Sequence, residues 1–176
     1  MANDNWETQN YIYDWIQSQL KFQMILDLAA NDRNHKCNIY ITKENNALKR
    51  NWVEGHAIVK LARGIDRISE KTGCFCNPPY SKPNLPRFTE KACLEAEKGL
   101  NQCFIVPLDI TSWSRDYVWG QAEVWIPDER IAFINPDTGQ IDGSPPKGSM
   151  IVIYGPLAVK GHIKSLHIPR PGEVVA

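Results

Sequence analysis

The sequence lacks both a long apolar run and an excess of charge of either sign. Its 176 residues carry 20 basic and 20 acidic side chains, so the formal net charge is zero. No apolar run approaches the roughly 20 residues that a membrane-spanning helix needs. The start of the chain is polar and acidic, unlike a secretory signal peptide. We therefore expect a cytoplasmic protein with no membrane segment. The zero net charge also argues against a generic nucleic-acid-binding protein.

The sequence also lacks the cysteine spacing of a zinc site. The number of cysteines is odd, and no two of them are separated by the two residues that a zinc knuckle requires. We expect no metal site, and we expect the thiols to be reduced and mostly buried. The five cysteines are Cys37, Cys74, Cys76, Cys93 and Cys103.

What is present has the size and composition of one globular domain. Hydrophobic residues make up 43% of the chain and charged residues 23%, both ordinary values for a globular protein. We find no internal repeat, no low-complexity tract and no linker long enough to divide the chain. The sequence therefore predicts a single domain over residues 1–176.

The charges are distributed unevenly along this domain. Residues 33–91 carry twelve of the 20 basic side chains but only five of the 20 acidic ones. A basic segment of this kind can form a local phosphate-binding surface without making the whole protein basic. It can equally be a solvated face with no ligand.

The hydrophobic pattern alternates strands with helices and then gives way to strands alone. The expected strands are residues 24–28, 37–41, 74–76, 103–106, 124–126, 131–134 and 150–154. The expected helices are residues 8–20, 87–99 and 112–119, residues 57–70 are compatible with a basic-faced helix, and the last twenty residues read as weakly structured. This order predicts an α/β fold, with a mostly parallel sheet and an antiparallel hairpin near the C-terminus.

Two polar side chains stand at or near the carboxyl ends of expected strands, where ligands bind in parallel sheets. Asp27 closes the first apolar strand, and Asn77 follows the strand at residues 74–76. Asp27 can cap a following helix, or it can orient the charged amino-acid end of a cofactor.

The segment Asn77-Pro78-Pro79-Tyr80 has the chemistry needed to activate an amino nitrogen. An exocyclic amino group on a base is a poor nucleophile because its lone pair is delocalised into the ring. The Asn77 side-chain oxygen and the Pro78 carbonyl can accept hydrogen bonds from this group. The prolines stiffen the loop that presents these acceptors. Tyr80 offers an aromatic face for a base swung out of a helix. The same four residues can also form a simple tight turn.

Several ordered motifs resemble the phage-type DNA N6-adenine methyltransferases, the Dam-like enzymes of bacteriophages. The resemblance covers Trp6 to Tyr154. It is carried by Trp6–Gln9, Leu26–Ala30, parts of 34–42, Asn77–Ser81 and Phe133–Met150. It implies a Rossmann-like methyltransferase fold, S-adenosylmethionine as the methyl donor, and adenine N6 in double-stranded DNA as the acceptor.

The resemblance also implies roles for single residues. It assigns catalysis to Asn77, Pro78, Pro79 and Tyr80. The implied cofactor-binding residues are Trp6, Thr8, Asp27, Ala29, Glu44 and Asn46. Family members often have an acidic residue followed by glycine where this chain has Asn46-Ala47. The resemblance implies a ribose-binding carboxylate shortly after the second strand, and Glu44 is the candidate, with Asn46 behind it.

The stretch 55–73 is longer than the family spacing and is a possible DNA-contacting insertion. Its alternative is a solvated helix. The candidate DNA-binding residues are Lys60, Arg63, Arg67, Lys82 and Arg87.

Three functions remain open from the sequence. The first is methylation of adenine N6 in DNA. The second keeps the reaction but acts on RNA adenine or on a protein glutamine amide. The third is a non-catalytic nucleic-acid-binding protein that retains the fold.

Overall fold

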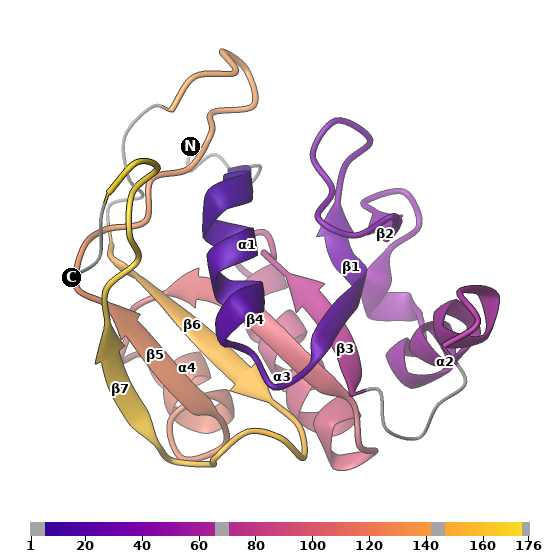
Figure 1. The fold of residues 1–176 in the computed structure, drawn as a ribbon. Helices are drawn as coiled ribbons and strands as arrows, with labels where there is room; N and C mark the ends of the chain where they lie inside the picture. Colours follow the sequence, from indigo (N-terminus) through magenta and orange to yellow (C-terminus); the bar gives the residue numbers. More distant parts are fainter. Residues whose placement is uncertain (1–5, 66–70, 142–146, 174–176) are drawn as a thin grey trace.

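The computed structural model describes residues 6–65, 71–141 and 147–173, and in this part of the chain seven strands form one sheet. The strands are β1 (Gln23–Ala30), β2 (Ile39–Thr42), β3 (Thr72–Cys76), β4 (Asn101–Pro107), β5 (Glu123–Pro127), β6 (Ser149–Tyr154) and β7 (Ile163–Leu166). Their order across the sheet is β2-β1-β3-β4-β6-β5-β7 (Figure 1). All strands run in one direction except β6, which is antiparallel to both β4 and β5. The mostly parallel α/β fold with an antiparallel pair near the C-terminus is thus confirmed.

Helices cover both faces of this sheet. The helical elements are α1 (Asn10–Gln19), the 3-10 turn η1 (Ala47–Lys49), α2 (Trp52–Ala62), α3 (Asn84–Glu97) and α4 (Ser112–Tyr117). Figure 1 shows α1 in front of the sheet, with α3 and α4 behind it. Neighbouring residues of β3 separate the two layers, since Phe75 packs into the cluster under α1 while Cys74 and Cys76 join the opposite cluster. Cys37 and Cys103 are also buried and all five cysteines are free, as expected from the sequence.

Helix α2 begins earlier than the sequence pattern indicates. Asn51 caps its first turn by accepting a hydrogen bond from the Glu54 amide at 3.2 Å, and Trp52 is fully buried. The helix ends at Ala62, so it overlaps the expected range 57–70 only in part. Helix α3 also starts ahead of its expected range, with Pro86 inside the first turn, where a missing amide hydrogen is tolerated.

The strand expected at residues 131–134 is wrong. Ile131 and Phe133 are buried, which explains the apolar pattern, but only Ile134 forms bridges. Its amide and carbonyl pair with those of Glu7 at 2.9 and 3.0 Å. The segment therefore ties the N-terminal residues to the sheet instead of extending it.

Residues 157–173 are more ordered than expected for this part of the chain. They contain β7, which adds to the sheet as a parallel neighbour of β5. Its four residues are only half-buried or exposed, and an edge strand of this kind gives a weak apolar alternation.

Candidate active site

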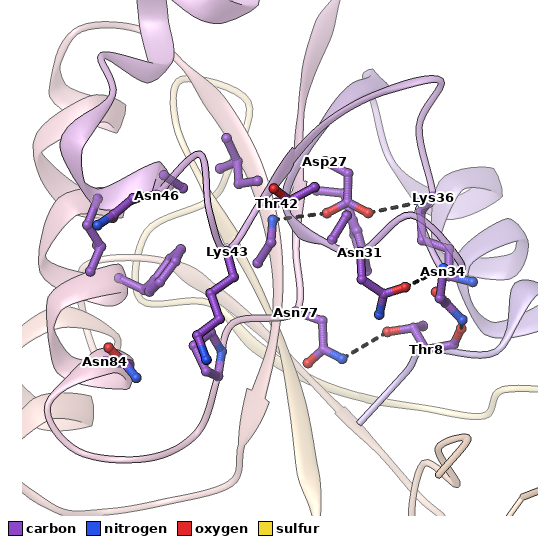
Figure 2. Close-up of a pocket in the computed structure, with 18 of the residues that line it drawn as sticks. Thr8, Asp27, Asn31, Asn34, Lys36, Thr42, Lys43, Asn46, Asn77 and Asn84 are labelled. Atoms are coloured by element: carbon purple, nitrogen blue, oxygen red, sulfur yellow. Dashed lines mark hydrogen bonds between the residues drawn. The ribbon is translucent and has the colours of Figure 1, made fainter. Parts of the chain in front are cut away.

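A cleft of about 1150 Å³ opens at the carboxyl ends of β1 and β3. Its walls come from residues 6–8, the end of β1 with the loop after it, the turn 42–49, the end of β3, and α3. Figure 2 shows the polar side chains that face it, with Asp27 and Asn77 from neighbouring strands. The two residues singled out from the sequence thus lie in one cleft, although β1 continues three residues beyond Asp27.

Asp27 is a buried carboxylate at one side of this cleft, with 2% of its surface exposed. Its Oδ2 accepts a hydrogen bond from the Lys36 amide at 2.9 Å, and its Oδ1 accepts one from the Ala29 amide at 3.2 Å. Burial raises the pKa of Asp27 to about 6, although the two amides act in the opposite direction. The carboxylate is therefore mainly ionised at neutral pH and is oriented before any ligand arrives. Its hydrogen bond to the Ala29 amide is a local turn, and no helix follows β1 for it to cap.

Asn77 stands directly after β3, and its side-chain amide is held by the N-terminal segment. Nδ2 donates to the Trp6 carbonyl oxygen at 2.9 Å and to the Thr8 hydroxyl oxygen at 3.2 Å. Figure 2 shows Oδ1 on the side turned away from Thr8. Among the described residues, no donor is hydrogen-bonded to Oδ1. The amide therefore presents an acceptor to the cleft.

Glu7 fixes the segment that holds Asn77, a role that the sequence did not suggest. Its backbone pairs with Ile134 in both directions. Its buried carboxylate accepts hydrogen bonds from Arg33 Nη2 at 2.9 Å, Asn31 Nδ2 at 3.2 Å and Asn34 Nδ2 at 3.3 Å. One side chain thus joins the N-terminal segment to the loop after β1. The only sequence signal was an acidic residue between Trp6 and Thr8.

The remaining cofactor candidates also line the cleft. Trp6 and Thr8 come from the N-terminal segment, and Ala29 lies beside Asp27. Glu44 is exposed, and the pKa of its carboxyl is lowered, chiefly by a hydrogen bond to its own amide. Asn46 has a φ of 49°, a left-handed conformation that Asn adopts more readily than most side chains.

The four residues of the predicted catalytic segment divide into two groups. Asn77 and Pro79 line the cleft, whereas Pro78 and Tyr80 do not. The Tyr80 hydroxyl donates to the Ile105 carbonyl at 3.3 Å, and its ring packs against the core. Burial raises the pKa of Tyr80. Stacking of Tyr80 on a base stays a prediction.

The basic candidates are more scattered than expected. Arg87 on α3 lines the cleft. Lys60 lies on α2 and Arg63 directly follows it. Neither of these residues lines the cleft, and Lys82 does not line it either. Arg67 lies outside the described residues.

Two lysines that the sequence did not single out line the cleft instead. Lys43 and Lys49 flank the turn that carries Glu44 and Asn46, and both are exposed. Figure 2 shows the Lys43 side chain extending from this turn into the cleft. Lys91 also lines the cleft, but it pairs with Glu95 at 2.9 Å and lies over the Trp52 ring.

The cleft thus combines three kinds of chemistry. An anion lies at Asp27, a neutral acceptor at Asn77, and cations at Lys43, Lys49 and Arg87. Apolar side chains fill the spaces between them; these are Leu28, Leu48, Phe75, Phe88 and Leu94. In the described ranges, no group of three potential metal ligands gathers, and no helix is long and apolar enough to cross a membrane.

Comparison with known proteins identifies relatives over nearly the whole chain. Residues 1–168 match the family described as DNA N-6-adenine-methyltransferase (Dam). A DNA N-6-adenine-methyltransferase of Haemophilus phage HP1 is 28% identical over 169 residues, which cover 94% of this chain and 86% of the relative. A DNA N-6-adenine-methyltransferase of Escherichia phage T1 is 27% identical, with 94% of this chain and 68% of the relative covered. No solved structure matches.

Proposed function

The chain belongs to the Dam family of DNA N-6-adenine methyltransferases, and we propose that its cleft binds S-adenosylmethionine beside Asp27 and the target adenine beside Asn77. The activity of the chain is transfer of a methyl group to N6 of adenine in DNA. The observation that supports the site best is the side-chain amide of Asn77. It presents its oxygen to a cleft that also holds a desolvated carboxylate.

The residues around Asp27 fit S-adenosylmethionine. The buried carboxylate suits the ammonium of the cofactor's amino-acid end, because a charged hydrogen bond is strongest where water is excluded. Trp6 and Ala29 line the same part of the cleft. The carboxylate of Glu44 can accept from ribose hydroxyls, with Asn46 beside it. The apolar side chains of the cleft offer a surface for the adenine ring of the cofactor. When bound, the cofactor supplies an electrophilic methyl group on a sulfonium.

Asn77 and its neighbours act on the target base. Oδ1 of Asn77 would accept one N6–H hydrogen bond. The other acceptor expected from the sequence, the Pro78 carbonyl, belongs to a buried residue outside the cleft lining, so Asn77 carries this role. Such a hydrogen bond would localise the lone pair on N6, so that the nitrogen could attack the methyl group that S-adenosylmethionine would supply. The leaving group would be the neutral thioether, and the proton released from N6 would pass to water. Because the amide of Asn77 is neutral, its role is to orient and polarise the amino group, not to remove the proton.

The substrate is proposed to be double-stranded DNA with the target base swung out of the helix. Lys43, Lys49 and Arg87 are placed to contact phosphates at the mouth of the cleft. Lys60 and Arg63, in the stretch 55–73, and Lys82, ahead of α3, are assigned to contacts with the flanking duplex. We propose one methyltransferase domain over 1–176, acting in the cytoplasm of a bacterial host. No observation favours RNA adenine or a glutamine amide.

In the test, the purified protein is incubated with labelled S-adenosylmethionine and one of four substrates: unmethylated duplex DNA, single-stranded DNA, RNA or protein. We expect label in N6-methyladenine of duplex DNA, and none with Asn77→Ala. Label in RNA or glutamine alone, or equal labelling by Asn77→Ala, would overturn the proposal. Asn45→Ala is the matched control, because Asn45 is exposed and does not line the cleft.

A further inference from the structure

An asparagine amide has two different ends, and only one of them can serve the reaction. The oxygen accepts hydrogen bonds, whereas the nitrogen donates two. The amino group of adenine is itself a donor, so a rotated Asn77 amide would place donor against donor. The protein therefore needs a device that decides which end faces the base.

The structure supplies that device from the N-terminal segment. The Trp6 carbonyl can only accept, so it requires Nδ2 at its side of the amide. The Thr8 hydroxyl oxygen receives the second Nδ2 hydrogen at 3.2 Å. With both hydrogens engaged, Oδ1 is the atom left for the substrate.

We propose that Thr8 is a positioning residue: the Trp6 carbonyl selects the end of the Asn77 amide that faces the segment, and the Thr8 hydroxyl, by accepting the second Nδ2 hydrogen, holds the amide in that orientation. This inference rests on the proposed function of Asn77. It gives the Thr8 hydroxyl a different partner from the cofactor contact that the sequence resemblance implies. The hydroxyl acts through Asn77 and does not touch the reacting atoms.

The acceptors are held firmly before any substrate arrives. Thr8 is 2% exposed, and its carbonyl accepts a hydrogen bond from Asn34 Nδ2 at 3.4 Å. Asn34 also binds the Glu7 carboxylate, and Glu7 pairs with Ile134. The orientation of Asn77 is thus fixed by a connected set of contacts. Such preorganisation lowers the activation barrier, because the acceptor does not have to be ordered during the reaction.

The test compares Thr8→Val, which replaces the hydroxyl by a methyl group of similar size, with Thr8→Ser, which keeps it. Thr8→Ala is a second hydroxyl-free variant, in case Thr8→Val folds poorly. Thr89→Val is the matched control, because the buried Thr89 hydroxyl donates to backbone carbonyls of its own helix and does not line the cleft. The measurements are kcat and KM for DNA, together with the Kd for S-adenosylmethionine in the absence of DNA.

We expect Thr8→Val to lower kcat roughly 10- to 100-fold, because misplacement of a reacting group is costly. The Kd for the cofactor should change less than about twofold, since the hydroxyl contacts Asn77 and not the cofactor. Thr8→Ser should recover most of the rate, and Thr89→Val should retain it. A normal kcat in Thr8→Val would contradict the inference. So would a loss of cofactor affinity that accounts for the lost rate, or an equal loss in Thr89→Val.

A second readout does not depend on activity. The Asn77 side-chain amide protons can be assigned by NMR as the pair that disappears in Asn77→Ala. They should exchange slowly with solvent in the wild type, and one should exchange faster in Thr8→Val but not in Thr8→Ser. Unchanged exchange would overturn the role of Thr8. A wild-type protein that methylates no DNA would refute the proposed function while leaving this measurement valid.

Discussion

The two strand ends that meet in the cleft, one around Asp27 in β1 and one at Asn77 after β3, handle hydrogen bonding in opposite ways. At Asp27 the protein buries a charge and satisfies both carboxylate oxygens with backbone amides. At Asn77 it uses a neutral group and satisfies only the donor end of the amide. The first arrangement suits tight binding of a cationic group, whereas the second keeps an acceptor available for a reaction. Binding and chemistry should therefore be separable by mutation.

The largest expected effect is the loss of chemistry at the Asn77 end. Asn77→Ala should lower the methyl-transfer rate about 10³-fold, as expected when a preorganised hydrogen-bonding group at a reacting centre is removed. The Kd for S-adenosylmethionine should stay within about twofold, because the variant leaves the Asp27 end intact. Single-turnover rates and calorimetry measure the two quantities. A large loss of cofactor affinity would show that the two ends are not separable.

The reverse pattern is expected at the other end. Asp27→Asn should weaken cofactor binding roughly 100-fold, because it removes the charge opposite a buried ammonium. At saturating cofactor, kcat should fall far less. Titration of both variants in parallel measures this contrast, with Asp32→Asn as a control on an exposed carboxylate that also lines the cleft. Equal loss in the Asp32 and Asp27 variants would argue against a special role for the buried group.

The pH dependence sharpens the same contrast. Since burial raises the pKa of Asp27 to about 6, the carboxylate takes up a proton as the pH falls through this value. A neutral carboxyl no longer attracts an ammonium, so cofactor affinity should fall by about tenfold per pH unit below the pKa. The affinity should level off above pH 7. Calorimetry from pH 5 to 8 checks this, and a flat profile would contradict the assignment.

The basic residues at the mouth should affect DNA and not the cofactor. Lys43→Ala, Lys49→Ala and Arg87→Ala should each raise the KM for DNA about fivefold and reduce the salt dependence of binding. Lys60→Ala and Arg63→Ala are the comparison, since they lie outside the cleft lining. Equal effects in both groups would extend the DNA surface over α2.

The smallest effect is expected where the two ends are joined. Glu7→Gln removes the charge that Arg33 binds. It should lower the free energy of unfolding by about 1–2 kcal/mol, as for a buried charged hydrogen bond. It should also lower kcat about threefold, because the residues that orient Asn77 are less firmly held. Glu129→Gln, whose partner Arg170 is exposed, should leave both quantities unchanged. Thermal and chemical denaturation, read alongside kcat, measure the difference.

The sequence predicted the parts of this protein that depend on local pattern. Apolar runs gave β1, β3, β4 and β6, and the strand ends gave Asp27 and Asn77, because these signals lie within a few residues of one another. It also gave the Rossmann-like family through ordered motifs. The apolar pattern wrongly predicted a strand at residues 131–134, since their burial comes from packing under the N-terminal segment and not from sheet pairing.

The contacts that orient the site were out of reach of the sequence. Glu7 pairs with Ile134, which lies far away in the sequence. Thr8 bonds Asn77, although the first three strands separate the two residues along the chain. Lys43 and Lys49 were passed over because nothing in a single sequence distinguishes a lysine at the mouth of a cleft from one elsewhere on the surface. Such roles depend on distant segments meeting in space.

The most direct test of the separation between Asp27 and Asn77 is the structure of a ternary complex with target DNA and S-adenosylhomocysteine. Asn77 Oδ1 should lie about 3 Å from N6 of the extruded adenine, and an Asp27 oxygen at a similar distance from the cofactor's ammonium. Asn77 Nδ2 facing the base, or an Asp27 carboxylate without contact to the cofactor, would contradict the account.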